Sequence, residues 1–259
     1  MGLLLWGLLN QWVIVFVNDL ADVDTDRDNS TFNLTSGGSR VLVDGSLSPR
    51  DLRIATAFIT VLWSAVTGWM AITWNLPGVG LALLAAIALL SSYSLKPIRL
   101  SYRGGGEVLQ AIGVGVVLPC LGYYAQSGGI SSISGLALAS TFILGLASGI
   151  TTSLPDTPSD ARSQKRTISV LHGQSAARIL SLLLIAAAIG LTASATSSLE
   201  PNTRLAIVAL PLVLLLSNIP RRKRSDARHI AQCKRFVITN LACQVSLLVA
   251  WTLALWLGL

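Results

Sequence analysis

The chain has 259 residues, of which 52% are hydrophobic and only 12% are charged, and its formal net charge is +7. Soluble domains are roughly a quarter charged, so this composition excludes an ordinary soluble domain. Three cysteines and two histidines, all isolated in the sequence, argue against a disulfide framework and a histidine-based metal site.

Eight runs of the chain are apolar enough to be membrane spans. A helix needs roughly 20 mostly apolar residues to cross the hydrocarbon layer of a bilayer, and the first run is near the lower limit of that length. The sequence therefore predicts an all-α, polytopic membrane bundle with a single domain. The runs lie at 2–17, 54–74, 78–95, 107–125, 131–153, 179–195, 204–219 and 236–258.

The charged residues between these runs fall on one side of the predicted membrane. Every basic residue except Arg204 lies in one of four loops, at 18–53, 96–106, 154–178 and 220–235. Because basic loops stay cytoplasmic, we expect these loops in the cytoplasm and both termini on the far side. The net positive charge thus indicates topology and not a nucleic-acid partner.

The first charged loop begins with the acidic stretch NDLADVDTDRDN at 18–29. On a helix, Asp22 and Asp26 share one face, and Asn18 lies one turn before them. Asp24 and Asp28 fall off that face and are expected to be solvated. Taken alone, the stretch could equally be a polar cap on the first span.

A second acidic pair, Asp156 and Asp160, repeats the same spacing in TSLPDTPSDARSQKRT at 152–167. Both pairs end an apolar run on the predicted cytoplasmic side, and both precede a basic segment. The repetition predicts two related halves, about 1–125 and 126–259, that pack around a central cavity into which the four carboxylates converge.

Carboxylates gathered in this way need cations among them, and hard oxygen ligands suit Mg²⁺, which commonly binds through carboxylates and substrate phosphates. Neighbouring loops supply basic side chains that are expected to bind phosphate oxygens. An acidic and basic cluster at the mouth of an apolar bundle predicts a substrate with a diphosphate head and a hydrocarbon tail. The basic candidates are Lys96, Arg99, Arg103, Lys165 and Arg166.

These motifs resemble those of the UbiA-type intramembrane prenyltransferases. NDLADVDTD is similar to their Asn-Asp-x-x-Asp-x-x-x-Asp signature, and DTPSD followed by QKRT is similar to their second motif. The similarity extends through GGSRVLVDGSLS (37–48), YSLKPIRLSYRGGGE (93–107) and LPCLGYYAQSG (118–128). The sequence around YRGGGE and LPDTPSDARSQKRT is most similar to that of the family branch that prenylates 1,4-dihydroxy-2-naphthoate for menaquinone or phylloquinone synthesis.

The resemblance implies a bundle of nine spans whose central cavity opens sideways to lipid. It implies Mg²⁺-dependent transfer of a prenyl group from a prenyl diphosphate to an aromatic acceptor, through an allyl cation. Lys165 and the KPIRLSYR cations would assist the diphosphate, and Tyr93 would lie near the reacting carbon. The implied metal and diphosphate set is Asn18, Asp22, Asp26, Asp156 and Asp160.

Two departures from the family pattern stand out. Eight spans are visible where nine are expected, and the missing one is the first; either translation begins upstream or the protein works without that helix. An extra leading helix would return the N-terminus to the cytoplasm. The family's usual Gly-Lys-x-Thr reads Gln164-Lys165-Arg166-Thr167, which is expected to alter the loop over the diphosphate.

Other functions remain open at this stage. A membrane terpene cyclase would use the same motifs without an acceptor, and a sugar-phosphate transferase would need a soluble phosphosugar. A cation transporter would place its acids near mid-membrane, whereas these lie at helix ends. Aromatic side chains are candidates for lining the pocket, namely Trp6, Trp12, Tyr93, Tyr102 and Tyr123.

Overall fold

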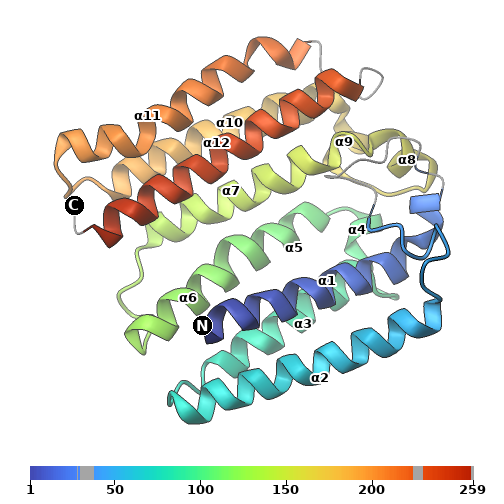
Figure 1. Ribbon diagram of the computed structural model, residues 1–259. Helices are drawn as coiled ribbons and strands as arrows, with labels where there is room; N and C mark the ends of the chain where they lie inside the picture. Colours follow the sequence, from blue (N-terminus) through green and yellow to red (C-terminus); the bar gives the residue numbers. More distant parts are fainter. Residues whose placement is uncertain (28, 30–37, 224–229, 258–259) are drawn as a thin grey trace.

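The computed structural model describes residues 1–27, 29, 38–223 and 230–257, and these ranges contain helices and connecting segments but no β-strand. The long helices lie side by side, and the short helices α4, α8 and α9 gather at one end of the bundle (Figure 1). The helices are α1 (Gly2–Arg27), α2 (Pro49–Thr73), α3 (Val79–Ser94), α4 (Leu100–Arg103), α5 (Gly106–Ile112), η1 (Gly113–Val117), α6 (Leu118–Ser127), α7 (Gly135–Ser153), α8 (Thr157–Arg162), α9 (Ile168–His172), α10 (Gln174–Ala195), α11 (Pro201–Asn218), η2 (Pro220–Lys223) and α12 (Ile230–Trp256).

Each of the eight predicted apolar runs is helical, which confirms the all-α membrane bundle. In the described part of the chain, seven helices are long and apolar enough to cross a membrane, with α5, η1 and α6 counted as one. The eighth, α3, is apolar but shorter at 16 residues. Helices α10 and α12 begin several residues before the predicted runs, because their first turns include polar side chains that hydropathy leaves out.

Helix α1 carries the acidic stretch as a direct continuation of the first apolar run. Residues 8–27 contain neither glycine nor proline, so nothing interrupts the backbone hydrogen bonds. Asn18, Asp22 and Asp26 therefore follow one another along one face of the helix, as predicted.

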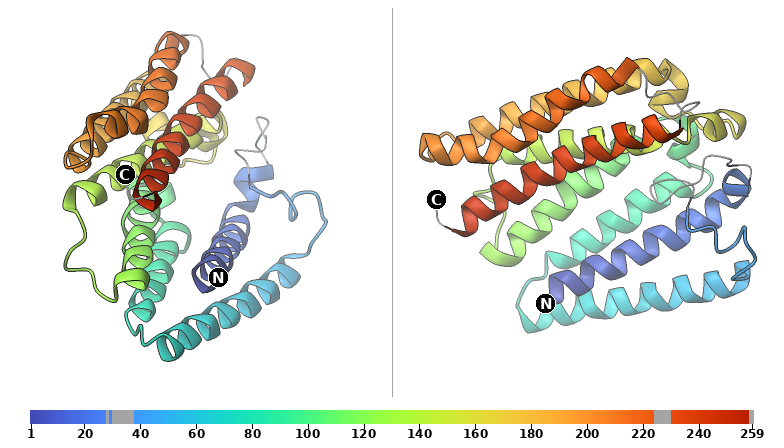
Figure 2. Two further views of the ribbon diagram at one scale, coloured as in Figure 1. Left: turned by 60° about the vertical axis from the view of Figure 1, so that its left-hand side comes forward. Right: turned by 45° about the horizontal axis from the view of Figure 1, so that its top comes forward.

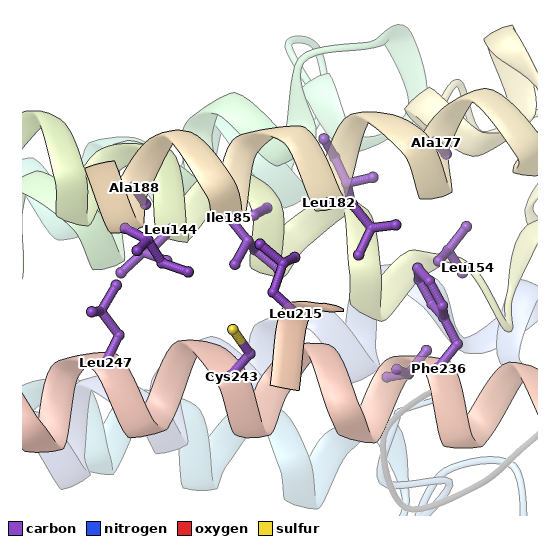
Figure 3. Close-up of a cluster of buried hydrophobic side chains, with 14 of the residues drawn as sticks. Leu144, Leu154, Ala177, Leu182, Ile185, Ala188, Leu215, Phe236, Cys243 and Leu247 are labelled. Atoms are coloured by element: carbon purple, nitrogen blue, oxygen red, sulfur yellow. The ribbon is translucent and has the colours of Figure 1, made fainter. Parts of the chain in front are cut away.

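The buried apolar residues form two clusters, one in each half of the chain. One joins α1, α2, α3 and α6, and the other joins α7, α10, α11 and α12. Figure 3 shows Phe236, Cys243 and Leu247 of α12 pointing toward the side chains of α7 and α10. In Figure 1, α1, α2 and α3 lie on one side of α5, α6 and α7, and α10, α11 and α12 lie on the other; Figure 2 shows the same bundle from two further directions.

Polar side chains inside the bundle also join helices. Trp6 of α1 donates from Nε1 to the hydroxyl of Thr67 in α2 at 3.0 Å. In the second half, Asn218 of α11 donates to Asn240 Oδ1 of α12 at 2.6 Å, and Asn240 in turn reaches Thr151 of α7 at 3.3 Å. Such bonds are favourable in a membrane because water does not compete for the polar groups.

Close packing at Gly115 joins the span of α5, η1 and α6 to α7. Pro119 lacks an N–H and so leaves the carbonyl of Gly115, four residues earlier, without its α-helical donor. The hydroxyl of Thr141 in α7 donates to that carbonyl at 2.6 Å. A side chain at Gly115 would lie 2.5 Å from the Thr141 carbonyl oxygen and 2.6 Å from Phe142 Cα, so this contact requires glycine.

We expect Gly115→Ala to lower the free energy of unfolding by about 2 kcal/mol, since the added methyl meets backbone atoms that cannot rotate away. The thermal midpoint in detergent, followed by tryptophan fluorescence, measures the effect. Gly122→Ala is the matched control, because Gly122 belongs to the same span and has open space around it. Equal midpoints for the two variants would contradict the proposed contact.

Candidate active site

The two acidic motifs meet at the end of the bundle where α1 contacts α8 (Figure 1). Asp156 occupies the N-cap position of α8, and Asp160 lies within that helix. Lys165 follows α8 through a tight turn, in which its N–H donates to the Asp160 carbonyl at 2.8 Å. The predicted convergence of residues from both halves is thus present in the fold.

Lys165 lies between the two motifs and contacts both. Its Nζ is 2.8 Å from Asp22 Oδ2 and 3.9 Å from Asp160 Oδ1. Burial disfavours the charge of Lys165, but the carboxylates of Asp22 and Asp160 outweigh this and raise its pKa above the usual value. Burial raises the pKa of Asp160 to about 7, although the Lys165 ammonium opposes the shift. The cluster therefore holds more carboxylates than one lysine can balance.

Tyr102 of α4 and Arg99, the residue just before α4, contact Asp22 from the other side. The Tyr102 hydroxyl donates to Asp22 Oδ1 at 2.9 Å, and an Arg99 Nη2 nitrogen is 3.6 Å from the same oxygen. The Arg99 guanidinium lies over the Tyr102 ring, 3.5 Å from its centre. Burial raises the pKa of Tyr102, which keeps its proton available for this bond.

Asp19 and Asp26 face the segment that follows the undescribed residues 30–37. The backbone and hydroxyl of Ser39 both donate to Asp19. A side chain at Gly38 would collide with the carboxylate of Asp26. Asp26 is close enough to Asp22 and Lys165 to interact electrostatically with them, so it belongs to the same cluster.

Asn29 supplies a second link between the motifs, because its amide donates to Asp156 Oδ1 at 2.8 Å. Asp24 is directed away, as predicted; its side chain is 92% exposed and pairs with Arg27. Asp28, for which the same was predicted, lies outside the described residues.

Two cavities adjoin at this end of the bundle. The polar cavity, of about 290 Å³, lies among α1, α3, α4, α5, α7 and α8, and its lining includes Asp156, Asp160, Lys165 and Glu107. The apolar cavity, of about 280 Å³, lies among α1, α3, α5, η1 and α6. Asn18, Tyr93 and Gln110 line both, and we call these three residues the junction.

The predicted phosphate-binding cations divide into two groups. Lys165 lines the polar cavity, and Arg99 lies beside Asp22. The side chains of Lys96, Arg103 and Arg166 are exposed and line neither cavity. Of the predicted aromatic residues, Tyr93 lines both cavities and Tyr102 contacts Asp22, whereas Trp6, Trp12 and Tyr123 line neither.

The donor set of the cluster fits a hard divalent cation. Within the described ranges, no three His, Cys, Asp or Glu side chains are close enough to hold a metal ion by themselves. The cluster nevertheless offers carboxylates and the amide oxygen of Asn18 around a cavity with room for further oxygen ligands. Mg²⁺ requires such ligands and commonly takes the rest from water and phosphate.

The chain matches a known protein family over most of its length. The model of the UbiA prenyltransferase family matches residues 1–242. The chain belongs to the UbiA prenyltransferase family. The fold is similar to the apo structure of a UbiA homolog from Aeropyrum pernix K1, with a TM-score of 0.70 over 98% of this chain and 88% of that one at 19% identity. No curated protein matches the sequence.

As a UbiA family member, the protein is an integral, multi-pass membrane protein, and the family implies a prenyl diphosphate substrate. The family match does not separate the branches, so the 1,4-dihydroxy-2-naphthoate branch stays a prediction. The cytoplasmic location of the charged loops also stays a prediction, although α4, α8 and α9, which belong to two of these loops, lie at one end of the bundle (Figure 1).

Two residues of this UbiA family member were not assigned a role from the sequence. Glu107 accepts a hydrogen bond from the backbone of Ile168 at 2.7 Å and so ties the loop after Lys165 to α5. Gln110, one turn later, belongs to the junction. The available signal was a pair of polar residues three apart at the start of an apolar span, which places both on one face of the helix.

Gln164, at a position where the resemblance predicts a glycine, has a backbone conformation that favours glycine. Its φ is +59°, in the left-handed region that costs a non-glycine residue roughly 1–2 kcal/mol. This turn directs Lys165 into the cavity. A glycine at position 164 would adopt the same turn without strain.

We expect Gln164→Gly to raise the free energy of unfolding by about 1 kcal/mol through relief of this strain. Ser163→Gly is the matched control, because Ser163 has a negative φ of −84° and gains nothing from glycine. Thermal unfolding in detergent compares the two. A loss of stability in Gln164→Gly equal to that in Ser163→Gly would contradict the strain argument.

Proposed function

We propose that this protein transfers a prenyl group from a prenyl diphosphate to an electron-rich aromatic acceptor, of the 1,4-dihydroxy-2-naphthoate type or a related quinone precursor. One observation carries the proposal, namely that a charged cavity and an apolar cavity share the junction of Asn18, Tyr93 and Gln110. A prenyl diphosphate fits this pair of cavities with its anionic head in the charged one and its reacting carbon at the junction, where it faces an acceptor in the apolar one.

Mg²⁺ fits the oxygen donors at the charged end. When bound there, it would neutralise charge that develops on the departing diphosphate. The residues that would hold it are Asn18, Asp22, Asp26, Asp156 and Asp160.

Residues of the chain bind the diphosphate head and orient the groups around it. Lys165 and Arg99 supply donors for phosphate oxygens, while Tyr102 keeps Asp22 oriented. The allylic carbon–oxygen bond breaks and its electron pair leaves with the diphosphate. A ring carbon of the acceptor then forms the new carbon–carbon bond and loses its proton to the released diphosphate.

The junction also suits the positive charge that appears on the prenyl chain. The ring of Tyr93 offers an electron-rich face to a nearby cation. The apolar lining contributed by α3, α5 and η1 keeps water from capturing the cation. Acceptor attack is then favoured over hydrolysis.

Asp22→Asn and Asp156→Asn are each expected to reduce diphosphate release at least about 100-fold, because each removes a carboxylate that holds the cation and head. Release of diphosphate by purified protein with Mg²⁺ and a prenyl diphosphate measures this. Asp24→Asn is the matched control; it makes the same change in the same acidic stretch at a side chain that is 92% exposed. Full turnover in both test variants would refute the assigned site.

Product formation should need both a divalent cation and an acceptor. We expect a prenylated ring only when Mg²⁺, a prenyl diphosphate and one aromatic acceptor are all present, and no product after chelation. Mass spectrometry with 1,4-dihydroxy-2-naphthoate, 4-hydroxybenzoate, homogentisate or no acceptor tests this. A cyclic hydrocarbon formed without any acceptor would replace the transferase with a membrane terpene cyclase.

A further inference from the structure

The polar side chains that line the apolar cavity are almost all of one chemical type, the carboxamide. Besides the Tyr93 hydroxyl they are all carboxamides, and no charged side chain of the described residues lines this cavity. The amides come from two directions, since Gln110 belongs to α5 and the others to α1. The α1 amides are Asn10, Gln11 and Asn18.

Among the side-chain hydrogen bonds of the described residues, none involves Asn10, Gln11 or Gln110. Gln11 is exposed, whereas Asn10 is 6% exposed and Gln110 is half-buried. Asn18 differs, because its Oδ1 accepts a bond from the Ser94 hydroxyl at 2.6 Å. The polar atoms of Asn10 and Gln110 are open to the cavity that they line, so both amides are positioned for a ligand that bonds to them.

The two amides lie at different depths. Asn10 precedes Asn18 by eight residues, which is about 12 Å along a helix, so it lies toward the end of the cavity that is remote from the acidic motifs. Gln110 lies at the junction itself, where its Oε1 would be 3.1 Å from a side chain added at Gly149 of α7. One amide is thus next to the reacting carbon, and the other is deep in the cavity.

We infer that Asn10 and Gln110 determine acceptor specificity by binding the two hydroxyl groups of a 1,4-dihydroxy aromatic ring. The inference rests on the proposed function for the ligand's role as acceptor. A hydroxyl both donates and accepts, and a carboxamide does the same, so each pair is complementary. Gln110 binds the hydroxyl beside the reacting carbon, and Asn10 binds the hydroxyl across the ring.

The same lining discriminates against an acceptor such as 4-hydroxybenzoate. When its reacting carbon is at the junction, its carboxylate occupies the place of the second hydroxyl, beside Asn10. A carboxylate in an apolar site needs a cation, and this cavity supplies none among the described residues. A carboxylate next to the reacting carbon, as in 1,4-dihydroxy-2-naphthoate, lies instead at the junction, where the cavity of Lys165 begins.

Direct binding to the full chain in detergent, by anaerobic titration calorimetry without prenyl diphosphate, tests the inference. The probes are 1,4-dihydroxynaphthalene, 1,4-dihydroxy-2-naphthoate and 4-hydroxybenzoate. We expect both diols to bind at least about tenfold more tightly than 4-hydroxybenzoate. Equal or tighter binding of 4-hydroxybenzoate would overturn the inference.

Asn10→Leu and Gln110→Leu are each expected to weaken binding of 1,4-dihydroxynaphthalene about tenfold, because a buried ligand hydroxyl loses its partner. Gln126→Leu makes the same change at an exposed amide that bonds only within its own helix, and should leave affinity unchanged. Wild-type affinity for the diol in both test variants would overturn the assignment.

Stability separates this role from a purely structural one. Asn10→Leu replaces a cavity-facing amide that makes no side-chain hydrogen bond within the described residues, so its thermal midpoint should equal or exceed that of the wild type. A lowered midpoint with unchanged selectivity among the probes would assign Asn10 to packing instead. Selective diol binding by a protein that releases no diphosphate with any prenyl donor would refute the proposed function alone.

Discussion

The arrangement of this protein depends on one buried contact, the ammonium of Lys165 between Asp22 and Asp160. The residues come from opposite halves of the chain, and the two halves have separate apolar clusters. In a partly buried site, opposite charges attract more strongly than in water, and like charges repel more strongly. The lysine therefore holds the acidic motifs together, yet leaves an excess of negative charge that favours a divalent cation and its phosphate ligands.

The close packing of α5 and η1 on α7 brings the charged and apolar cavities together. Gly115 of η1 and Gly145 of α7 allow the helices to approach until added side chains would meet backbone atoms. Gly149, further along α7, lines the polar cavity and leaves room for the amide of Gln110. Small residues on one helix face thus set the distance between helices and the width of the junction at the same time.

The sequence predicted the features that depend on local geometry. The apolar runs and the shared face of Asn18, Asp22 and Asp26 follow from helix periodicity alone. Tertiary contacts were harder to predict. Arg166 was grouped with Lys165, but the left-handed turn at Gln164 directs only the lysine inward. The role of Asn10 could not be predicted from the sequence, because the sequence pattern around an amide in an apolar run is the same whether the amide faces lipid, another helix or a cavity.

The choice of amides for the apolar cavity is consistent with cation chemistry. A charged side chain there would need water or a counter-ion to be stable, and water beside an allyl cation would capture it. A carboxylate would itself attack the cation, and an ammonium would raise its energy. Neutral amides bind ring hydroxyls without any of these effects. Asn10 and Gln110 thereby give the cavity polarity for recognition, while the separation between a charged end and an uncharged interior is maintained.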